Sequence, residues 1–308
     1  MGLPYTVAEL AGTEPRRRYD VNQAKIDTLL LMLLRGGAFL CFAGWMWQHY
    51  YWEGPCGVLF WQDGSLDLVE ELGGDWESFV GTGANDGWVQ RVTAWIAWPC
   101  LVCAILTLTV RRSARVQMAG LLAGGGLLAV VAYAKYVSSQ RELPMLVEHG
   151  GQVLSPVLLV LALAFGVRHR ATVVTAILAF VMVFAGHGAY ALGLWPTPPN
   201  FYGMTTVILG SDHGMTKTLL CVVGALDIAV CVGVLIPGVR RVSAVYAAGW
   251  GLATAIARPV AGMSISLSYY GADQYLHEAV LRAPHFLIPM FLFFLWQQPN
   301  EHESLAPT

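Results

Sequence analysis

Long apolar segments alternate with short polar connections along the whole chain. Eight segments approach the length of a helix that crosses the hydrocarbon layer: 27–48, 90–110, 116–137, 152–167, 171–194, 214–236, 242–262 and 281–297. The fourth and the eighth are short and contain Pro156, Pro284 and Pro289, so each is expected to be a tilted or partly re-entrant span. The pattern predicts an all-α polytopic membrane protein with about eight transmembrane helices.

The composition agrees with this class and excludes others. Hydrophobic residues make up 56% of the chain and charged residues 12%, which is typical of a protein solvated by lipid. No basic stripe indicates a nucleic-acid partner. The first apolar segment follows a polar lead, residues 1–26, and lacks a small-residue cleavage pattern, so it is expected to be retained as a span.

Basic residues favour one side of the membrane. Arginine or lysine residues stand before the first span and in every second connection after it: Arg16, Arg17, Arg18, Lys25, Arg111, Arg112, Arg115, Arg168, Arg170, Arg240 and Arg241. Since such residues accumulate on the cytoplasmic side, the lead and the tail 298–308 are both predicted to be cytoplasmic. The expected location is the cell (inner) membrane, and the opposite connections form an acidic outer face.

The two halves of the chain share a pattern. Glu148-His149 and His277-Glu278 lie 129 residues apart, and the same offset superimposes Arg111-Arg112 on Arg240-Arg241. This predicts a tandem duplication with four-helix repeats at 27–170 and 171–297. The first repeat carries a long outer loop, 49–88, in which the apolar spacing of 66–79 predicts one short interfacial helix. The two acid–imidazole pairs precede the last span of each repeat and are expected to meet at one membrane surface.

Residues 171–296 carry a motif of known type. Phe184-Ala-Gly-His187-Gly is followed by Trp195-Pro196, then by Gly224-Ala-Leu-Asp227 and Pro237-Gly-Val-Arg240-Arg241. This half resembles the DoxX-like membrane family. The resemblance implies a four-helix bundle unit and, for members linked to sulfur oxidation, a membrane subunit of a thiosulfate:quinone oxidoreductase or quinol-oxidase complex. In the first half, Phe42-Ala-Gly-Trp45 has tryptophan in place of the histidine, so that repeat is expected to be mainly structural.

Four ionisable residues fall within apolar segments: His187, Asp227, Arg258 and His285. Such side chains are costly in hydrocarbon unless they are paired, neutral or in contact with water, so they are functional candidates. His187 and Asp227 lie at different depths, and contact between them is not expected. Arg258 is at the depth of His187 and of the group Asp273, His277 and Glu278.

A quinone-linked redox reaction would use such groups, because electron transfer to or from a quinone is coupled to protons. His187 would hold the head group and Glu278 would pass protons. The candidate catalytic residues are His187, Asp227, Arg258, His277 and Glu278, and the candidate walls of the quinone site are Tyr190, Trp195, Tyr202 and Trp250. The haem-attachment sequence Cys-x-x-Cys-His is absent, so electrons would come from a partner subunit or another cofactor.

Other interpretations remain open from the sequence. Glu148, His149, His213 and His277 are candidate ligands of iron, zinc, copper or haem, although they would have to converge from separate segments. A proton-coupled transporter of a small solute would also use His187 and Asp227. A third alternative is a non-catalytic assembly or anchor subunit that packs beside an enzyme in the lipid bilayer.

Overall fold

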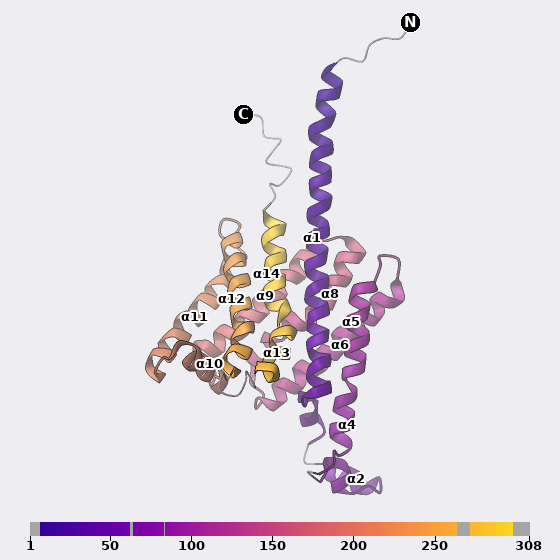
Figure 1. The fold of residues 1–308 in the computed structure, drawn as a ribbon, viewed down its shortest axis with the longest axis vertical. Coiled ribbons are helices and arrows are strands. Elements are labelled where there is room, and N and C mark those ends of the chain that lie inside the picture. Colours follow the sequence, from indigo (N-terminus) through magenta and orange to yellow (C-terminus); the bar gives the residue numbers. More distant parts are fainter. Residues whose placement is uncertain (1–6, 62–63, 83, 264–271, 298–308) are drawn as a thin grey trace.

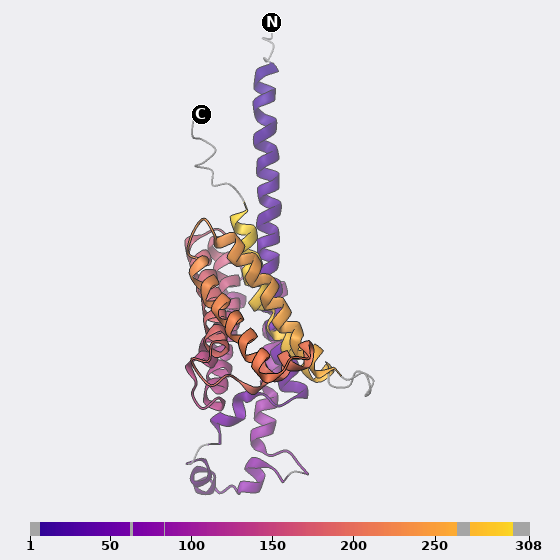
Figure 2. The ribbon, with the colours of Figure 1, turned by 90° about the vertical axis from the view of Figure 1, so that its left-hand side faces the viewer.

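The protein is a bundle of long helices (Figures 1 and 2). A computed structural model describes residues 7–61, 64–82, 84–263 and 272–297, with side chains from residue 23. Within these ranges the chain is helical and forms no β-strand. The predicted all-α membrane class is therefore confirmed.

The elements follow one another with short connections except in the first outer loop. They are α1 (Val7–Tyr51), η1 (Pro55–Leu59), α2 (Ser65–Glu71), α3 (Trp76–Val80), α4 (Trp88–Trp95), α5 (Ala97–Thr109), α6 (Arg115–Ser138), α7 (Leu143–Glu148), α8 (Gly150–Phe165), α9 (Arg170–Ala191), α10 (Pro199–Leu209), α11 (His213–Gly233), α12 (Arg240–Gly262), α13 (Ala272–Leu281) and α14 (Ala283–Trp296).

Seven helical segments of the described chain are long and apolar enough to cross a membrane: Gln23–Tyr51, Trp88–Thr109, Arg115–Ser138, Leu143–Phe165, Arg170–Ala191, His213–Gly233 and Ala272–Trp296. A multi-pass membrane protein follows from these segments. The remaining expected span, 242–262, corresponds to α12, which has 23 residues but is not among the seven. Its glycines, its threonine and Arg258 lower its hydropathy, and one face of it nevertheless packs against α13 and α14.

The fourth and eighth spans are longer than expected. Each consists of two helices in line, α7 with α8 and α13 with α14, giving spans of 23 and 25 residues. The breaks fall at His149 and at Arg282, whereas Pro156 and Pro289 lie inside continuous helices. A full span broken near one end therefore replaces the short, proline-kinked segment that the sequence predicts.

This arrangement corrects the expected position of the acid–imidazole pairs. Glu148 and His149 lie at the break between α7 and α8, and His277 and Glu278 lie within α13. The side chains of Glu148, His149 and His277 are buried. Glu278 is partly exposed, and all four residues lie within the spans rather than before them, because the spans begin earlier than the apolar segments indicate.

The two sequence halves pack across one another. The last span of the second half, α13 with α14, packs on α1, and the last span of the first half, α7 with α8, packs on α9. A glycine is required at each crossing. A Cβ atom at Gly44 of α1 would lie 2.5 Å from the backbone nitrogen of Leu281, and one at Gly186 of α9 would lie 2.7 Å from that of Glu148. These are the glycines of the two Phe-Ala-Gly motifs.

The stretch 66–79, for which one short helix is expected, is divided between two short helices, α2 and α3. Gly73 has φ +76°, a left-handed conformation that ends the turn after α2. Asp75 then caps α3 by accepting a hydrogen bond from the backbone nitrogen of Ser78 at 2.8 Å. The region lies at the end of the bundle opposite the start of α1 (Figure 1).

The start of α1 and the end of α14 lie at one end of the molecule (Figure 1). The arginine-bearing connections between α5 and α6, α8 and α9, and α11 and α12 share that end, because the spans alternate in direction. There Arg168 pairs with Asp27 of α1 at 2.9 Å. The arginines of these three connections thus lie at one end of the bundle, whereas the exposed Arg141 lies in the connection between α6 and α7 at the other end.

The glycine crossing at α9 yields a stability prediction. Gly186→Ala forces a methyl group against the backbone of Glu148 and should destabilise the protein by about 1–3 kcal/mol. Gly126→Ala in α6 is the matched control, because nothing lies within 4 Å of the added Cβ and alanine favours the helix. Thermal unfolding of both purified variants in detergent should show a lower Tm for Gly186→Ala alone. Equal Tm values would contradict the close crossing.

Candidate functional site

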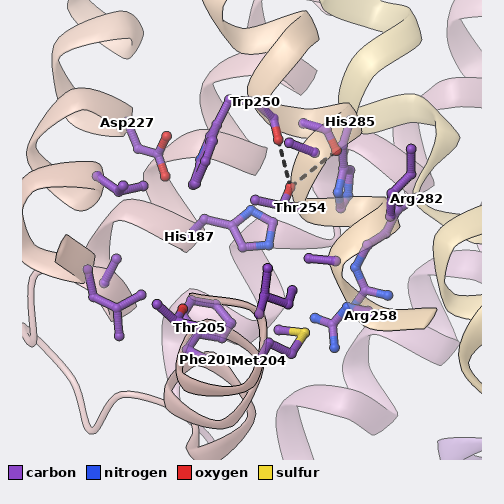
Figure 3. A pocket seen from close by; sticks show the side chains of 18 of the residues that line it. His187, Phe201, Met204, Thr205, Asp227, Trp250, Thr254, Arg258, Arg282 and His285 are labelled. Carbon is purple, nitrogen blue, oxygen red and sulfur yellow. Dashed lines mark hydrogen bonds between the residues drawn. The ribbon is translucent and has the colours of Figure 1, made fainter. Parts of the chain in front are cut away.

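A cavity of about 580 Å³ lies among α9, α10, α11, α12 and α14 (Figure 3). Most of its lining is apolar, from side chains such as Phe184, Phe201, Leu220 and Trp250. Five ionisable residues interrupt this lining: His187, Asp227, Arg258, Arg282 and His285. The cavity therefore combines a lipophilic interior with a few hydrogen-bonding groups, as ligand sites commonly do.

The lining of the cavity extends to the exposed surface of the helix bundle. Ile208 and Leu209 of α10 and Ile256 and Val260 of α12 line it and are also exposed. In a membrane this apolar surface faces lipid. A ligand inside the cavity would therefore have a path to the bilayer between α10 and α12.

His187 is held between α9 and the break in the fourth span. Its Nδ1 lies 3.1 Å from the carbonyl oxygen of Val183, one turn earlier in α9, and its Nε2 lies 3.5 Å from Oε2 of Glu148. A carbonyl oxygen only accepts, so Nδ1 carries a hydrogen. Nε2 is then free to take a proton from the Glu148 carboxyl group or to return one to it.

His285 is the least satisfied polar group in the cavity. It lies in the first turn of α14, directly after the break at Arg282 and Pro284, and its side chain is only 3% exposed. Neither ring nitrogen has a hydrogen-bond partner among the described residues. Its ring meets that of His187 edge to face at 5.4 Å between centroids. Buried polar atoms normally find partners, so this imidazole is suited to a ligand with hydrogen-bonding atoms.

Asp227 lies on the opposite wall of the cavity from His285 (Figure 3). It is buried on α11 and its Oδ1 has no partner in the described part of the chain. Close packing of α11 on α9 places it there, since a Cβ at Gly188 would lie 3.1 Å from Cβ of Asp227. No ion pair or hydrogen bond joins the described side chains of Asp227 and His187. This agrees with the expected difference in depth.

A charged triad borders the cavity on the side of α13. Oε2 of Glu278 lies 2.9 Å from Nη1 of Arg258 and 3.1 Å from Nη1 of Arg282. The expected contact of Arg258 with the His277 and Glu278 group is thus found at Glu278. One carboxylate forms ion pairs with two guanidinium groups, and these ion pairs offset the hydration free energy that the guanidinium groups lose inside the bundle.

A second, smaller cavity of about 110 Å³ lies behind this triad. Its walls are polar and apolar in about equal parts, and the polar part includes Lys135 of α6, Glu148, His149 and Glu278. Arg258, Arg282 and Phe201 line both cavities and so form the partition between them. Asn200, an exposed residue at the start of α10, also lines the smaller cavity and marks its approach to the surface.

The predicted site residues separate into two groups. His187, Asp227, Arg258 and Trp250 line the larger cavity, and Glu278 lines the smaller one. His277 lines neither, because its ring stacks on Trp52 at 6.2 Å with its Nδ1 unpartnered in the described chain.

Three of the four aromatic residues that are predicted to line the quinone site do not line the cavity. The Tyr190 hydroxyl donates to Oε2 of Glu142 at 2.8 Å, Tyr202 stacks on His213 at 4.9 Å, and Trp195 is exposed. The walls come instead from Phe184 and Phe201 and from aliphatic residues of α10, α11 and α12. Tyr190 and Tyr202 are thus occupied by polar or ring partners outside the cavity.

The predicted metal ligands are not brought together. No group of three or more His, Cys, Asp or Glu residues suited to a metal ion occurs in the part of the chain that the structure describes. Glu148 and His149 are neighbours, with Nδ1 of His149 3.8 Å from Oε1 of Glu148, but His213 and His277 are held by Tyr202 and Trp52.

Sequence reasoning missed the partner of His187 and two of the cations. The sequence pattern indicates Glu148 only as the neighbour of His149 and as a metal ligand, and it indicates no role for Arg282 or Lys135. The available signal was Gly186, which directly precedes His187 and permits another backbone to approach.

Comparison with known proteins adds no assignment. No protein-family model matches the sequence, and neither a curated protein nor a solved structure matches it. The DoxX-like resemblance therefore stays a prediction that depends on the motifs around His187 and Asp227.

The charged triad yields a test of the site's electrostatics. Glu278→Gln keeps the shape but leaves Arg258 and Arg282 without their shared carboxylate, which should cost about 3 kcal/mol of folding free energy. The control is Asp27→Asn, whose pair with Arg168 is more exposed and should contribute about 0–1 kcal/mol. Thermal unfolding in detergent compares the two variants. A Tm for Glu278→Gln no lower than that of Asp27→Asn would show that the triad does not stabilise the fold.

Proposed function

We propose that the larger cavity binds the ring of a quinone and that the protein is the membrane subunit of a quinone-linked system that oxidises a small compound. One observation carries the proposal: the buried imidazole of His285, with both nitrogens unpartnered in the described chain, lines an apolar cavity beside His187. A quinone ring offers carbonyl oxygens to such donors and apolar surface to the remaining walls. The cavity volume is in the range of small-molecule sites.

The opening of the cavity supports a ligand drawn from the bilayer. The exposed lining residues Ile208, Leu209, Ile256 and Val260 connect its interior with the lipid-facing surface. An isoprenoid tail could remain in this opening while the ring occupies the polar end. The same lining favours a lipophilic ligand over the small polar solute that a transporter would require.

A bound quinone supplies acceptance or release of two electrons coupled to two protons. His285 would donate a hydrogen bond to a ring oxygen at one end of the cavity, and His187 would do so once its Nε2 is protonated, because its Nδ1 donates to Val183. Arg258 and Arg282 border the same space and would favour developing negative charge there. Asp227, on the opposite wall, is placed to interact with a second polar group of the ligand. In these roles the side chains form hydrogen bonds, stabilise charge or transfer protons, and none of them carries electrons.

The source of electrons lies outside this set of side chains. The resemblance to the DoxX-like family, some members of which are linked to sulfur oxidation, supports a small sulfur compound as the reductant and a partner subunit as the electron donor. If the arginine-bearing end faces the cytoplasm, as the positive-inside rule predicts, both termini would be cytoplasmic and the α10 end would lie outside. The site would then open in the outer half of the membrane.

Quinone binding can be measured directly by quenching of tryptophan fluorescence. A short-chain quinone should quench the purified protein, and Trp250→Phe should remove part of the quench because Trp250 lines the cavity. His285→Ala should weaken binding at least about tenfold, the equivalent of one hydrogen bond to the ligand of about 1.4 kcal/mol. His213→Ala is the control, since His213 lines neither cavity. Unchanged affinity in His285→Ala would place the ligand elsewhere.

The redox role is tested in membranes that contain the protein with its genomic neighbours. Reduction of a short-chain quinone should be supported by thiosulfate or another small reductant and should fall at least about tenfold in His187→Ala. Abundance and Tm of the variant are measured in parallel. Full activity at normal abundance would remove His187 from the mechanism, and loss of abundance alone would make it a structural residue.

A further inference from the structure

Glu148 stands at the boundary between the two cavities. It is the last residue of α7, directly before the break in the fourth span, and only 6% of it is exposed. It lines the smaller cavity, while His187, 3.5 Å from its Oε2, lines the larger one. The carboxyl–imidazole pair is thus a polar connection between two spaces that Arg258, Arg282 and Phe201 otherwise separate.

We propose that Glu148 exchanges protons between His187 and the aqueous surface by way of the smaller cavity. The inference rests on the proposed function, because protons are consumed or released where a quinone ring is reduced or oxidised. It assigns the proton-transfer role to Glu148, which the sequence analysis gave to Glu278.

The smaller cavity provides the route to the surface. Its wall contains exposed Asn200 at one point and the polar side chains Gln48, Lys135 and His149 elsewhere. A cavity of about 110 Å³ with several polar side chains in its wall can hold several water molecules. Protons can therefore pass between the α10 end of the protein and Glu148 through hydrogen-bonded water.

Glu278 lacks the freedom that this role needs. Its Oε2 accepts from both Arg258 and Arg282, and protonation would leave two guanidinium groups unpaired inside the bundle. Glu148 has only the two imidazoles as direct ionic neighbours in the described chain.

The surroundings of Glu148 set the charge that it experiences. His149 lies beside it on the same span and His187 faces it from α9. Lys135 of α6, Arg258 of α12 and Arg282 before α14 face it across the smaller cavity, together with Glu278 of α13. The three cations outnumber Glu278, so the cavity tolerates the ionised form of Glu148 without fixing it in one ion pair.

The transfer step involves protons alone. The Glu148 carboxyl group gives its proton to Nε2 of neutral His187, leaving a carboxylate and an imidazolium whose Nδ1 still donates to Val183. The imidazolium then gives its Nε2 proton to a ring oxygen in the larger cavity, and a proton from the aqueous surface, relayed by water in the smaller cavity, restores the Glu148 carboxyl group. Electrons come from the reductant through the partner subunit. For quinol oxidation each transfer runs in reverse.

Labelling with dicyclohexylcarbodiimide tests the inference without any quinone, because this hydrophobic reagent modifies protonated carboxyl groups in membrane proteins. The purified full-length protein in detergent is labelled across a pH series and the modified residues are located by mass spectrometry. Labelling at Glu148 should fall at least about tenfold as the pH rises, and Glu278 should remain unmodified. Absence of the label from Glu148, or equal labelling of Glu278, would overturn the assignment.

Glu148→Gln provides the functional arm. The variant should bind quinone within about twofold of the wild type by fluorescence quenching and reduce it at least about tenfold more slowly. Normal turnover in this variant would overturn the inference. Failure of the wild type to bind quinone would instead contradict the proposed function, and the labelling result would still decide whether Glu148 exchanges protons.

Discussion

The arrangement of the helices depends on two places where the break in a helical span packs closely against a glycine of another helix. The break between α7 and α8 rests on Gly186 of α9, and the break between α13 and α14 lies near Gly44 of α1. The first crossing brings Glu148 of one half to His187 of the other. Without side chains at these glycines the backbones approach closely, and van der Waals packing and buried polar contacts then hold the helices together in lipid.

The buried charges fall into two arrangements with different consequences. Arg258, Glu278 and Arg282 form ion pairs with one another, and the two arginines, with Phe201, form the partition between the cavities. His285, Asp227 and Glu148 are buried and His187 is half-buried; these four residues have fewer partners and face the cavities. Since an unsatisfied polar group is costly in a membrane protein, the second group is the one that a ligand and moving protons would use.

The sequence predicted what depends on composition and periodicity. The helical class, the multi-pass character and the segregation of arginines follow from apolar length and charge, and His187 and Arg258 were identifiable as ionisable residues within spans. The contact between Arg258 and Glu278 followed from their depth. The breaks at His149 and Arg282 were not predictable in this way, because polar residues at the ends of spans resemble loop residues until the packing is known.

Tertiary packing also decided the remaining differences. Tyr190 and Tyr202 appeared suitable as walls because they are near His187 in the sequence, but Glu142 and His213 engage them instead. Glu148 could be connected to His187 only through the crossing at Gly186, which joins residues from different halves.

The most direct test of the proposed site is a structure of the protein with a quinone bound at saturating concentration. The account predicts a ring within hydrogen-bonding distance of His285 or His187 and a tail between α10 and α12. A quinone bound outside this cavity, or none bound at saturation, would contradict it.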